Sequence, residues 1–473
     1  MFRKNFWVHF LLAAALVAVA AIAGKISRTD FTFERRSDVA SDITRVRPVA
    51  VERSESESEP EVLVKFRPGT SLDRVRRLAA SLNDRVEDEI ESVNGLVAID
   101  DLDDASAASV ASQYAAMGDL VAYAEPNIRI ELDPMATAAY QRPVSAPSSK
   151  SPNDPMFSEQ WALNNDGTNG GKVSADIGAL KAWLRTQGSE EVVVAVLDSG
   201  VDYTHPDLVG NIWMRPDNIP AYTDDELGTI DDKNGFNAVE NASDPMDDNG
   251  HGTHCAGIIG AEGDNGLGIA GVNWKVEIMP LKFIGKGGFG STKNAIEAIN
   301  YAIERKKAGV NVRVINASWG STLYSKALED AIRAAGEQGI LFVAAAGNNS
   351  SDNDRSPHYP SNYDLPNVIS VAALDRSDQL ASFSNYGVGT VDIAAPGKDI
   401  LSTWLNDAFR EASGTSMAAP QVAGVAALIV ASDPKINVED LKARLLQSVD
   451  KLDWLTDKVK TGGRLNAGKA LEN

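Results

Sequence analysis

Hydrophobic and polar positions follow different patterns in successive parts of this chain. Residues 8–23 are apolar, follow the basic pair Arg3 and Lys4, and end in Ala-Ile-Ala-Gly, which is typical of a secretory signal peptide. A retained membrane anchor is the alternative, although about 16 apolar residues are short for a hydrocarbon core roughly 30 Å thick. Residues 24–60 are charged and have no apolar period, which predicts a disordered spacer. The signal peptide is therefore predicted over residues 1–23.

From residue 61 the pattern changes to short strands and helices in the order β-α-β-β-α-β. This order predicts a small α+β unit of the ferredoxin-like type over residues 61–133. Residues 134–153 are rich in Ala, Ser and Pro, which predicts an exposed linker that is open to cleavage. The strands of the unit are predicted at 61–66, 86–90, 96–100 and 120–125, and its helices at 71–82 and 105–117.

Strands and helices then alternate over residues 154–473. The strand candidates are short runs of β-branched residues, which suit strands buried on both faces of a parallel sheet. The pattern predicts an α/β fold with a mostly parallel sheet and helices on both faces, whose sites gather at the carboxyl ends of strands. Strands are predicted at 191–197, 276–283, 310–315, 340–346, 367–372 and 391–393, and helices at 291–307, 325–338, 417–431 and 437–448.

Charge and cysteine content exclude several classes of function. The 473 residues carry 45 basic and 66 acidic side chains, for a net charge of −21. This balance argues against binding nucleic acid or an anionic membrane surface, since both require clustered Lys and Arg. Cys255 is the only cysteine, so the chain can form neither an internal disulfide nor a Cys-rich zinc site.

Asp198 directly follows one of the buried strands, in the sequence Asp-Ser-Gly. An acid at the end of a buried strand is costly unless it has a partner. It could cap a turn, or bind ribose in a nucleotide fold, but no glycine-rich phosphate motif accompanies it. A structural acid that caps a turn and a catalytic acid both remain open at this point.

His251 lies between two glycines in Asn249-Gly-His-Gly-Thr-His254 and opens an apolar helix. The glycines let the backbone approach closely and keep the imidazole accessible. A zinc site of His251 and His254 is the alternative, but helical zinc pairs usually occur as H-E-x-x-H with a nearby carboxylate.

Ser416 lies in Gly-Thr-Ser-Met-Ala-Ala-Pro at the start of a long Ala-rich helix. A serine there is usually a cap, but a helix N-terminus can also hold a developing oxyanion. Asn348 follows another strand, and its amide can donate to an oxyanion without carrying charge. Asp198, His251 and Ser416 would supply an orienting acid, a general base and a nucleophile.

The four segments V-L-D-S-G, H-G-T-H-C-A-G, A-A-G-N and G-T-S-M-A-A-P closely resemble, in order and spacing, those of the subtilisin-like serine proteases, or subtilases. The resemblance covers residues 154–470, and residues 61–133 match the subtilase propeptide more weakly. It implies that Ser416 is the nucleophile, His251 the general base and acid, and Asp198 the orienting carboxylate. Asn348 and the Ser416 N–H would form the oxyanion hole, and His254 would be structural.

The same resemblance implies a substrate cleft in which an extended peptide pairs with main chain. A phosphate-binding role for the glycine-rich loop at 287–290 is the alternative, but its Lys-Ser/Thr partner is missing. Small residues would leave the S1 pocket open and uncharged, which predicts broad specificity with apolar or aromatic P1 residues. The predicted substrate-binding residues are Ser318, Trp319, Gly320, Gly288, Ala345 and Gly347.

Calcium is the cofactor that the resemblance implies, and hard oxygen ligands in acidic loops suit it. Asp154, Asp207 and Asn265 match the strong calcium site of the family. The carbonyls of Gly263, Leu267 and Ile269 would complete it, and three ordinary turn residues are the alternative. Residues 231–235 are a weaker candidate loop.

The sequence thus predicts a secreted serine endopeptidase made as a self-inhibited zymogen. Residues 61–133 would be its intramolecular inhibitor, polypeptides its substrates, and the mature protein a monomer with no nucleic-acid or membrane partner. A narrow-specificity processing protease and a catalytically silent binding protein on the same fold are the alternatives. The lone Cys255 would lie beneath His251.

Overall fold

The central sheet is built from strands whose successive side chains face two different cores. In the computed structural model, strand β7 (Gly188–Asp198) contributes Val194 and Val196 to one apolar cluster and Ala195 and Leu197 to another. Because side chains alternate along a strand, both faces of this sheet must be covered. The structure describes residues 62–140, 151–168, 170–224 and 227–472, which all belong to the compact unit Glu59–Asn473. The predicted signal peptide (1–23) and spacer (24–60) lie outside the described residues.

The sheet has nine strands in the order β10-β11-β7-β13-β14-β15-β16-β20-β19. Every pairing from β10 to β20 is parallel, and only β19 is antiparallel. The predicted mostly parallel α/β sheet is therefore confirmed. The strands besides β7 are β10 (Phe236–Asn237), β11 (Lys275–Lys282), β13 (Val312–Ala317), β14 (Leu341–Ala345), β15 (Val368–Leu374), β16 (Ile393–Pro396), β19 (Asp450–Lys451) and β20 (Gly463–Arg464).

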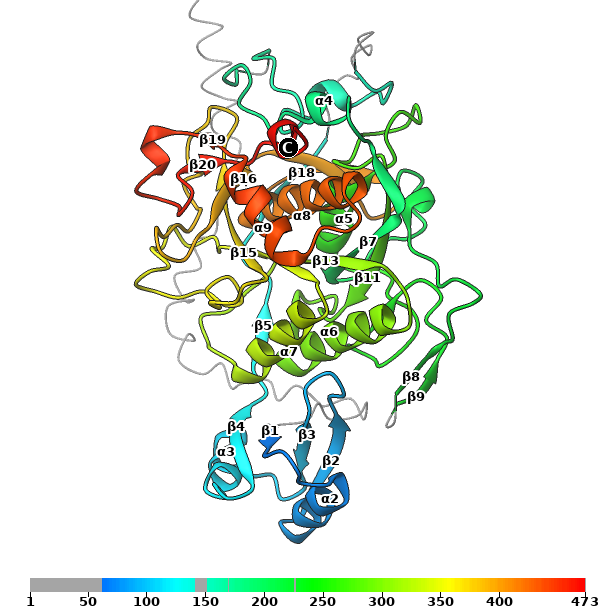
Figure 1. Cartoon of the computed structure of the whole chain (residues 1–473), viewed down its shortest axis with the longest axis vertical. Helices are drawn as coiled ribbons and strands as arrows, with labels where there is room; N and C mark the ends of the chain where they lie inside the picture. The colour runs from blue at the N-terminus through cyan, green and yellow to red at the C-terminus, as the bar shows by residue number, and fades with distance from the viewer. Residues whose placement is uncertain (1–61, 141–150, 169, 225–226, 473) are drawn as a thin grey trace, which may run out of the picture. The chain divides into compact units, whose positions relative to one another are not determined.

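Helices cover both faces of the sheet (Figure 1). One face carries α5 (His251–Gly260), α8 (Thr415–Ser432) and α9 (Val438–Gln447), and the other carries α6 (Thr292–Lys307) and α7 (Lys326–Glu337). The short helices α4 (Ala179–Ala182) and α10 (Ala467–Ala470) also pack on the first face.

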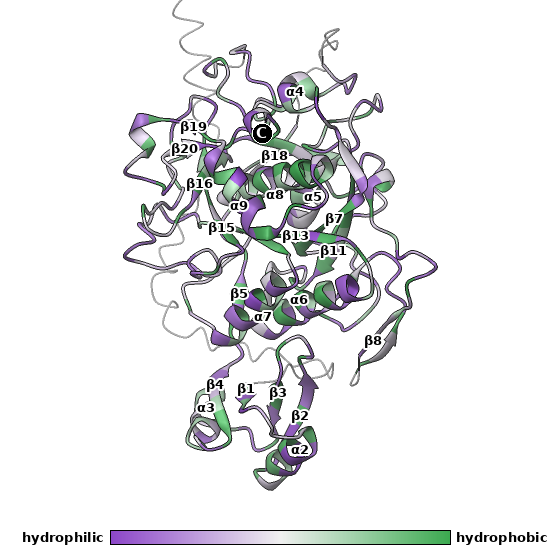
Figure 2. Cartoon of the chain, viewed as in Figure 1, coloured by the Kyte–Doolittle hydropathy of each residue, from purple (hydrophilic) through white to green (hydrophobic). Residues whose placement is uncertain are grey.

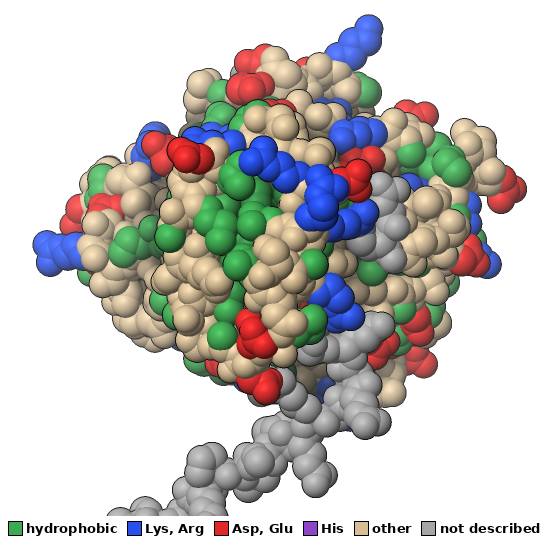
Figure 3. All heavy atoms as spheres, turned by 90° about the horizontal axis from the view of Figure 1, so that it is seen from below, with side chains coloured by type: hydrophobic (Ala, Val, Ile, Leu, Met, Phe, Trp, Pro, Cys, Tyr) green, Lys and Arg blue, Asp and Glu red, His purple; other side chains and the backbone are tan. Residues whose placement is uncertain are grey.

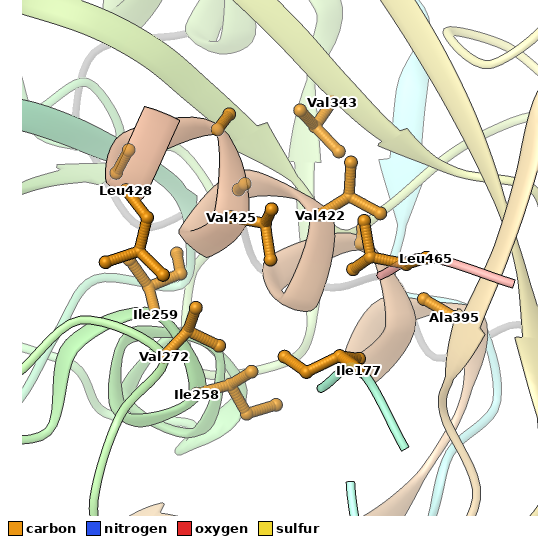
Figure 4. Close-up of a cluster of buried hydrophobic side chains, with 14 of the residues drawn as sticks. Ile177, Ile258, Ile259, Val272, Val343, Ala395, Val422, Val425, Leu428 and Leu465 are labelled. Atoms are coloured by element: carbon orange, nitrogen blue, oxygen red, sulfur yellow. The ribbon is translucent and has the colours of Figure 1, made fainter. Parts of the chain in front are cut away.

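Helix α8 is the centre of the larger core. Figure 4 shows Val425 and Leu428 of α8 among Ile258, Ile259 and Val272. Within the described part of the chain, α8 alone is long and apolar enough to cross a membrane, but 89% of it is buried inside the protein. The green interior helix of Figure 2 is therefore a core helix.

Residues 62–126 form a separate small layer of sheet and helix, in the predicted order β-α-β-β-α-β. The four strands are antiparallel in the order β2-β3-β1-β4, and the two helices pack on them around Val75 and Tyr114. The elements are β1 (Val62–Phe66), α2 (Leu72–Ser81), β2 (Asp84–Glu89), β3 (Leu96–Asp101), α3 (Ala107–Ala115) and β4 (Val121–Pro126).

Several short antiparallel elements differ from the sequence prediction. Residues 134–153 are predicted as linker, but residues 136–139 form an exposed strand, β6, and residues 141–150 lie outside the described residues. The short elements are β5 (Arg129–Glu131), β6 (Ala136–Ala139), β8 (Tyr222–Asp224), β9 (Gly228–Ile230), β12 (Phe289–Ser291), β17 (Ile400–Trp404) and β18 (Ala408–Ser413). Strands β5 and β6 have no apolar run, and pairing with the distant strands β12 and β18 defines them, whereas β8 pairs with β9 and β17 with β18 in local hairpins.

The surface mixes the two signs of charge. On the face drawn in Figure 3, Lys and Arg side chains surround a patch of apolar side chains, with Asp and Glu side chains interspersed. On this face the Lys and Arg side chains do not form a continuous stripe.

Candidate active site

Asp198 and His251 meet at the carboxyl edge of the sheet. Asp198 ends β7, His251 is the first residue of α5, and their Oδ1 and Nδ1 atoms lie 2.7 Å apart. Both side chains are buried. Burial lowers the pKa of His251, but the charge and hydrogen bond of Asp198 outweigh it and raise the pKa above its ordinary value. The Asp198 contact leaves Nε2 of His251 as the nitrogen that can exchange a proton.

Close backbone packing brings these two elements together. A Cβ atom on Gly252 would lie 2.0 Å from the carbonyl oxygen of Gly200, so only glycine fits where α5 crosses the turn after β7. Asp247 holds the same corner, because it accepts hydrogen bonds from the N–H groups of Asn249, Gly250 and Thr253 and from two hydroxyls. The loop before α5 is thereby fixed on the turn after Asp198.

We expect Asp247→Ala to lower the free energy of unfolding by about 2–4 kcal/mol, because it leaves several buried N–H groups without an acceptor. Denaturant titration of the variant measures this loss, and Asp244→Ala in the same loop is the control. A loss below about 0.5 kcal/mol would contradict the role given to Asp247.

Ser416 lies in the first turn of α8, facing the end of β13. Its Oγ donates to the carbonyl oxygen of Ser318 at 3.0 Å, and its own carbonyl accepts from Ser318 Oγ at 2.8 Å. The Sγ of Cys255 also donates to that carbonyl, at 3.4 Å. The lone cysteine therefore joins the helix that carries His251 to the helix that carries Ser416. Burial raises the pKa of the Cys255 thiol well above its ordinary value, so it is inert as a nucleophile.

The proposed base and nucleophile are not joined by a hydrogen bond in this arrangement. Among the described residues, Nε2 of His251 has no hydrogen-bond partner, while Ser416 Oγ is engaged by Ser318. Such contacts are often loose before substrate is bound, and a rotation about χ1 of Ser416 would redirect the hydroxyl.

Asn348 is oriented by the residue before Ser416. Its Oδ1 accepts from the N–H and the hydroxyl of Thr415, at 2.8 and 2.9 Å. Because the amide oxygen is used in this way, the Nδ2 donor must face the cleft. It contacts the carbonyl oxygen of Pro134 at 3.4 Å.

Residues 129–139, which we call the tail, run across this site. Strand β5 pairs antiparallel with β12, Glu131 bridges to Gly320 on the other side, and the N–H of Leu132 donates to the carbonyl of Gly288. Strand β6 then pairs with β18, which leads directly into Ser416. The tail thus lies in the cleft as an added strand and pairs with backbone on both sides of it. Extended peptides bind to sheet edges in the same way.

The residues predicted for substrate binding have different roles in this geometry. Gly288 and Gly320 contact the tail through their backbone groups. The side chain of Trp319 is buried and donates to Leu197, and Ser318 bonds Ser416. Ala345 is buried at the end of β14, and Gly347 lies between Asn385 and His358.

An uncharged S1 pocket remains a prediction, but one imidazole lies beside two of the small residues from which it was predicted. The imidazole of His358 is buried against Gly320 and Gly347, where added Cβ atoms would lie 2.0 and 3.0 Å from the ring. Tyr359 forms a backbone pair with Ser321, which brings the preceding His358 to this place. No local signal in the sequence predicts this position, because the contact depends on two loops that are distant in the chain.

The predicted calcium ligands come together in part. Asn265 Nδ2 donates to Asp207 at 3.0 Å, and the backbone N–H of Asn265 donates to Asp154 at 3.2 Å. Ile269 and Leu267 contact this group through their N–H groups, and Gly263 packs on Trp274. Burial and the charge of Asp154 raise the pKa of Asp207 to about 6. Two buried carboxylates are ligands that suit a hard cation such as Ca²⁺, but in this arrangement their oxygens accept N–H groups, and Asn265 presents its NH2 group to Asp207.

His254 lies one turn after His251 and is structural in this geometry. Its Nε2 contacts the carbonyl oxygens of Ile400 and Arg410, and burial lowers its pKa to about 3. A neutral imidazole that donates to carbonyls is not available to bind zinc through that nitrogen. Sequence reasoning missed Asp247 and His358, although the acidic run before His251 was a usable signal for Asp247.

The mostly parallel sheet thus ends in Asp198 beside His251, with Ser416 in the first turn of a helix, which is a combination of residues that serine hydrolases use. The subtilase family model matches residues 189–467, more than half of the chain, so this chain belongs to the subtilase family. The model of the fervidolysin N-terminal prodomain matches residues 51–127.

The chain is similar to several named proteases. It is 40% identical to the thermophilic serine proteinase of Bacillus sp. (strain AK1) over 290 residues, 61% of this chain and 64% of that protein. Thermitase of Thermoactinomyces vulgaris is 35% identical over 322 residues, 68% of this chain and 99% of thermitase. The crystal structure of fervidolysin from Fervidobacterium pennivorans has the same fold, with a TM-score of 0.66 at 24% identity over 89% of this chain and 62% of that chain.

Proposed function

We propose that this subtilase is a serine endopeptidase whose triad is Asp198, His251 and Ser416. The observation that carries the proposal is the buried 2.7 Å contact between Asp198 and His251. Ser416 would attack the carbonyl carbon of a peptide bond while His251 Nε2 takes its proton and returns it to the leaving amine. Water would then hydrolyse the acyl-enzyme in the reverse sense.

Asn348 would stabilise the oxyanion in both steps. Its orientation by Thr415 supports this role, because a donor that is fixed before reaction pays no reorganisation cost when charge develops. The backbone N–H of Ser416, in the first turn of α8, would be the second donor.

The prodomain, residues 61–133, would act as an intramolecular inhibitor. Glu125 supports this, because its carboxylate accepts from the N–H groups of Lys326 and Ala327 at the start of α7. Asn127 accepts from the N–H of Lys293 at the start of α6. Carboxylate and amide oxygens at two helix N-termini would hold the tail in the cleft until it is cut.

We further propose that the protein is secreted after removal of residues 1–23, that residues 134–153 are cut during maturation, and that residues 154–473 act as a monomer. Substrates would pair through main chain with Gly288 and Gly320, which supports broad specificity. The predicted apolar or aromatic P1 preference assumed an uncharged pocket and is replaced below.

Calcium would be held by Asp154, Asp207 and Asn265, which tie the segment at residue 154 to two loops. We expect EDTA to lower the Tm by about 5–10 °C, because a ligand that binds only the folded protein stabilises it by mass action. Calorimetry with and without EDTA measures this shift. Asp207→Asn should have a low Tm that EDTA no longer changes, and an unchanged Tm of the parent would contradict the site.

The test of the proposed function is labelling with a fluorophosphonate followed by mapping of the modified peptide. We expect modification at Ser416 and hydrolysis of casein by the same preparation. A narrow-specificity processing enzyme would label at Ser416 but leave casein intact, and a silent binding protein would not label at all.

A further inference from the structure

The tail that crosses the active site brings the carboxylate of Asp133 next to the imidazole of His358. Oδ2 of Asp133 lies 3.4 Å from Nε2 of His358. The exposed fractions of the two side chains are 9% and 4%, so both are nearly removed from water. Among the described residues, His358 is the only ion-pair partner of Asp133.

His358 is held in place for this contact. Its N–H donates to Asn362 Oδ1 at 3.1 Å, and its carbonyl accepts from Ser361 Oγ and from the N–H of Asn362. The ring fills the space beside Gly320 and Gly347 that any larger residue would occupy. Because the backbone is fixed on one side and the glycines leave room on the other, Nε2 of His358 is directed toward the tail.

A buried carboxylate is costly unless it is paired, so Asp133 gains a place in this pocket only through a donor. Oδ2 of Asp133 accepts no hydrogen bond among the described residues in this arrangement, and Nε2 of His358, at 3.4 Å, is placed to donate one. Nδ1 of His358 has no hydrogen-bond partner among the described residues, so the ring has no competing contact on the protein side.

The tail occupies the cleft without presenting a good scissile bond. Asn348 donates to the carbonyl of Pro134 and not to that of Asp133, so the tail lies one residue out of the register in which the Asp133 carbonyl would meet the proposed oxyanion hole. The bond between Asp133 and Pro134 also has a tertiary amide nitrogen. The tail therefore competes with substrates for the pocket next to Ser416, and the side chain it inserts there reports what the pocket accepts.

We propose that His358 is the residue that determines P1 specificity, and that it selects an acidic P1 side chain, Asp or Glu. The proposal rests on the proposed function of the same site. It replaces the apolar or aromatic P1 preference, because a donor at the base of the pocket stabilises a carboxylate and is left unpaired by an alkyl or phenyl group.

The test uses the activated protein and anilide peptides Ile-Glu-Leu-X, which copy residues 130–132 of the tail, with X as Asp, Asn, Leu, Phe or Lys. We expect kcat/KM for Asp to exceed that for Asn and Lys by about tenfold or more, since hydrogen bonds to charged groups are the strong ones. In His358→Leu the preference should pass from Asp to Leu and Phe, while His358→Gln, which keeps a donor, should retain part of the preference for Asp.

A second measurement leaves the pocket unchanged. In the full chain, Asp133→Asn should shed the prodomain about tenfold faster than the parent, and Asp119→Asn, which removes an exposed prodomain charge, should match the parent. A preference for Phe or Leu in the parent, or equal prodomain retention in Asp133→Asn, would overturn the inference. Absence of both fluorophosphonate labelling and hydrolysis of every peptide would instead overturn the proposed function on which it rests.

Discussion

Ser416→Ala is expected to reduce peptide hydrolysis by about 10⁶-fold, to the level of contaminating activity. The variant loses the attacking oxygen, while the buried contact between Asp198 and His251 remains. We also expect it to accumulate as the full-length chain, because a chain without its nucleophile does not cut its own linker. The fold should be retained, since among the described residues Ser416 Oγ makes a single hydrogen bond, to Ser318.

The measurement is turnover of a chromogenic peptide together with the mass of the purified chain after incubation. Ser432→Ala, an exposed serine in the last turn of the same helix, is the matched control and should mature and turn over normally. Normal maturation of Ser416→Ala would show that an external protease cuts the linker. Undiminished turnover would exclude Ser416 as the nucleophile.

The sheet and the positions of the proposed triad were predictable from local sequence. Strand β7 is apolar at every position from Val192 to Leu197, which only a strand with both faces covered requires. Asp198 then falls at a strand end, and His251 and Ser416 fall at helix N-termini. Parallel strands share one carboxyl edge, so these ends had to lie near one another.

The contacts that control access to the site were not predictable in this way. His358 reaches Gly320 through a backbone pair between Ser321 and Tyr359, which no pattern of spacing indicates. Strand β6 has the composition of a linker because Ala136–Ala139 has no apolar face, and its pairing with β18 defines it as a strand. Both depend on surfaces that form only after the chain has folded.

The net charge alone also did not predict where the acidic side chains lie in the folded protein. The value of −21 suggested solubility and calcium loops, yet part of the acidity is buried where the prodomain meets helix α6. Glu297 of α6 is completely buried, and Asp88 of the prodomain is almost completely buried. Lys293 pairs with Asp88 at 3.0 Å.

This buried cluster holds more acids than bases. The negative charges of Asp224 of strand β8 and Glu91 of the prodomain belong to the same cluster, and Tyr222 lies beside it. Burial and the charge of Asp88 raise the pKa of Glu297 well above its ordinary value. Burial and the charge of Asp224 raise the pKa of Glu91 to about 8, although the exposed part of Glu91 is screened by solvent. A protonated Glu297 can donate to Asp88, which satisfies both groups without a second cation.

The prodomain should therefore bind more weakly as the pH rises. A carboxyl whose pKa is higher in the bound state takes up a proton on binding, so the bound state is favoured at low pH. That stabilisation is complete below the pKa of the separated groups, near the ordinary 4.5 of a Glu, and is lost as the pH rises through the raised values. We expect the fraction of chains with a released prodomain to increase about tenfold or more between pH 5 and 8.

The full-length Ser416→Ala chain isolates this equilibrium, because it cannot cut itself and only added trypsin can remove the released prodomain. Glu297→Gln in that background carries an amide at every pH, so its prodomain should be released less between pH 5 and 8 than that of the parent, and Glu91 accounts for the release that remains. Glu304→Gln, on the same helix and partly exposed, should release the prodomain with the pH profile of the parent. Comparing variants at each pH cancels the pH dependence of trypsin itself. Identical profiles for Glu297→Gln and the parent would exclude Glu297 as a source of the pH response.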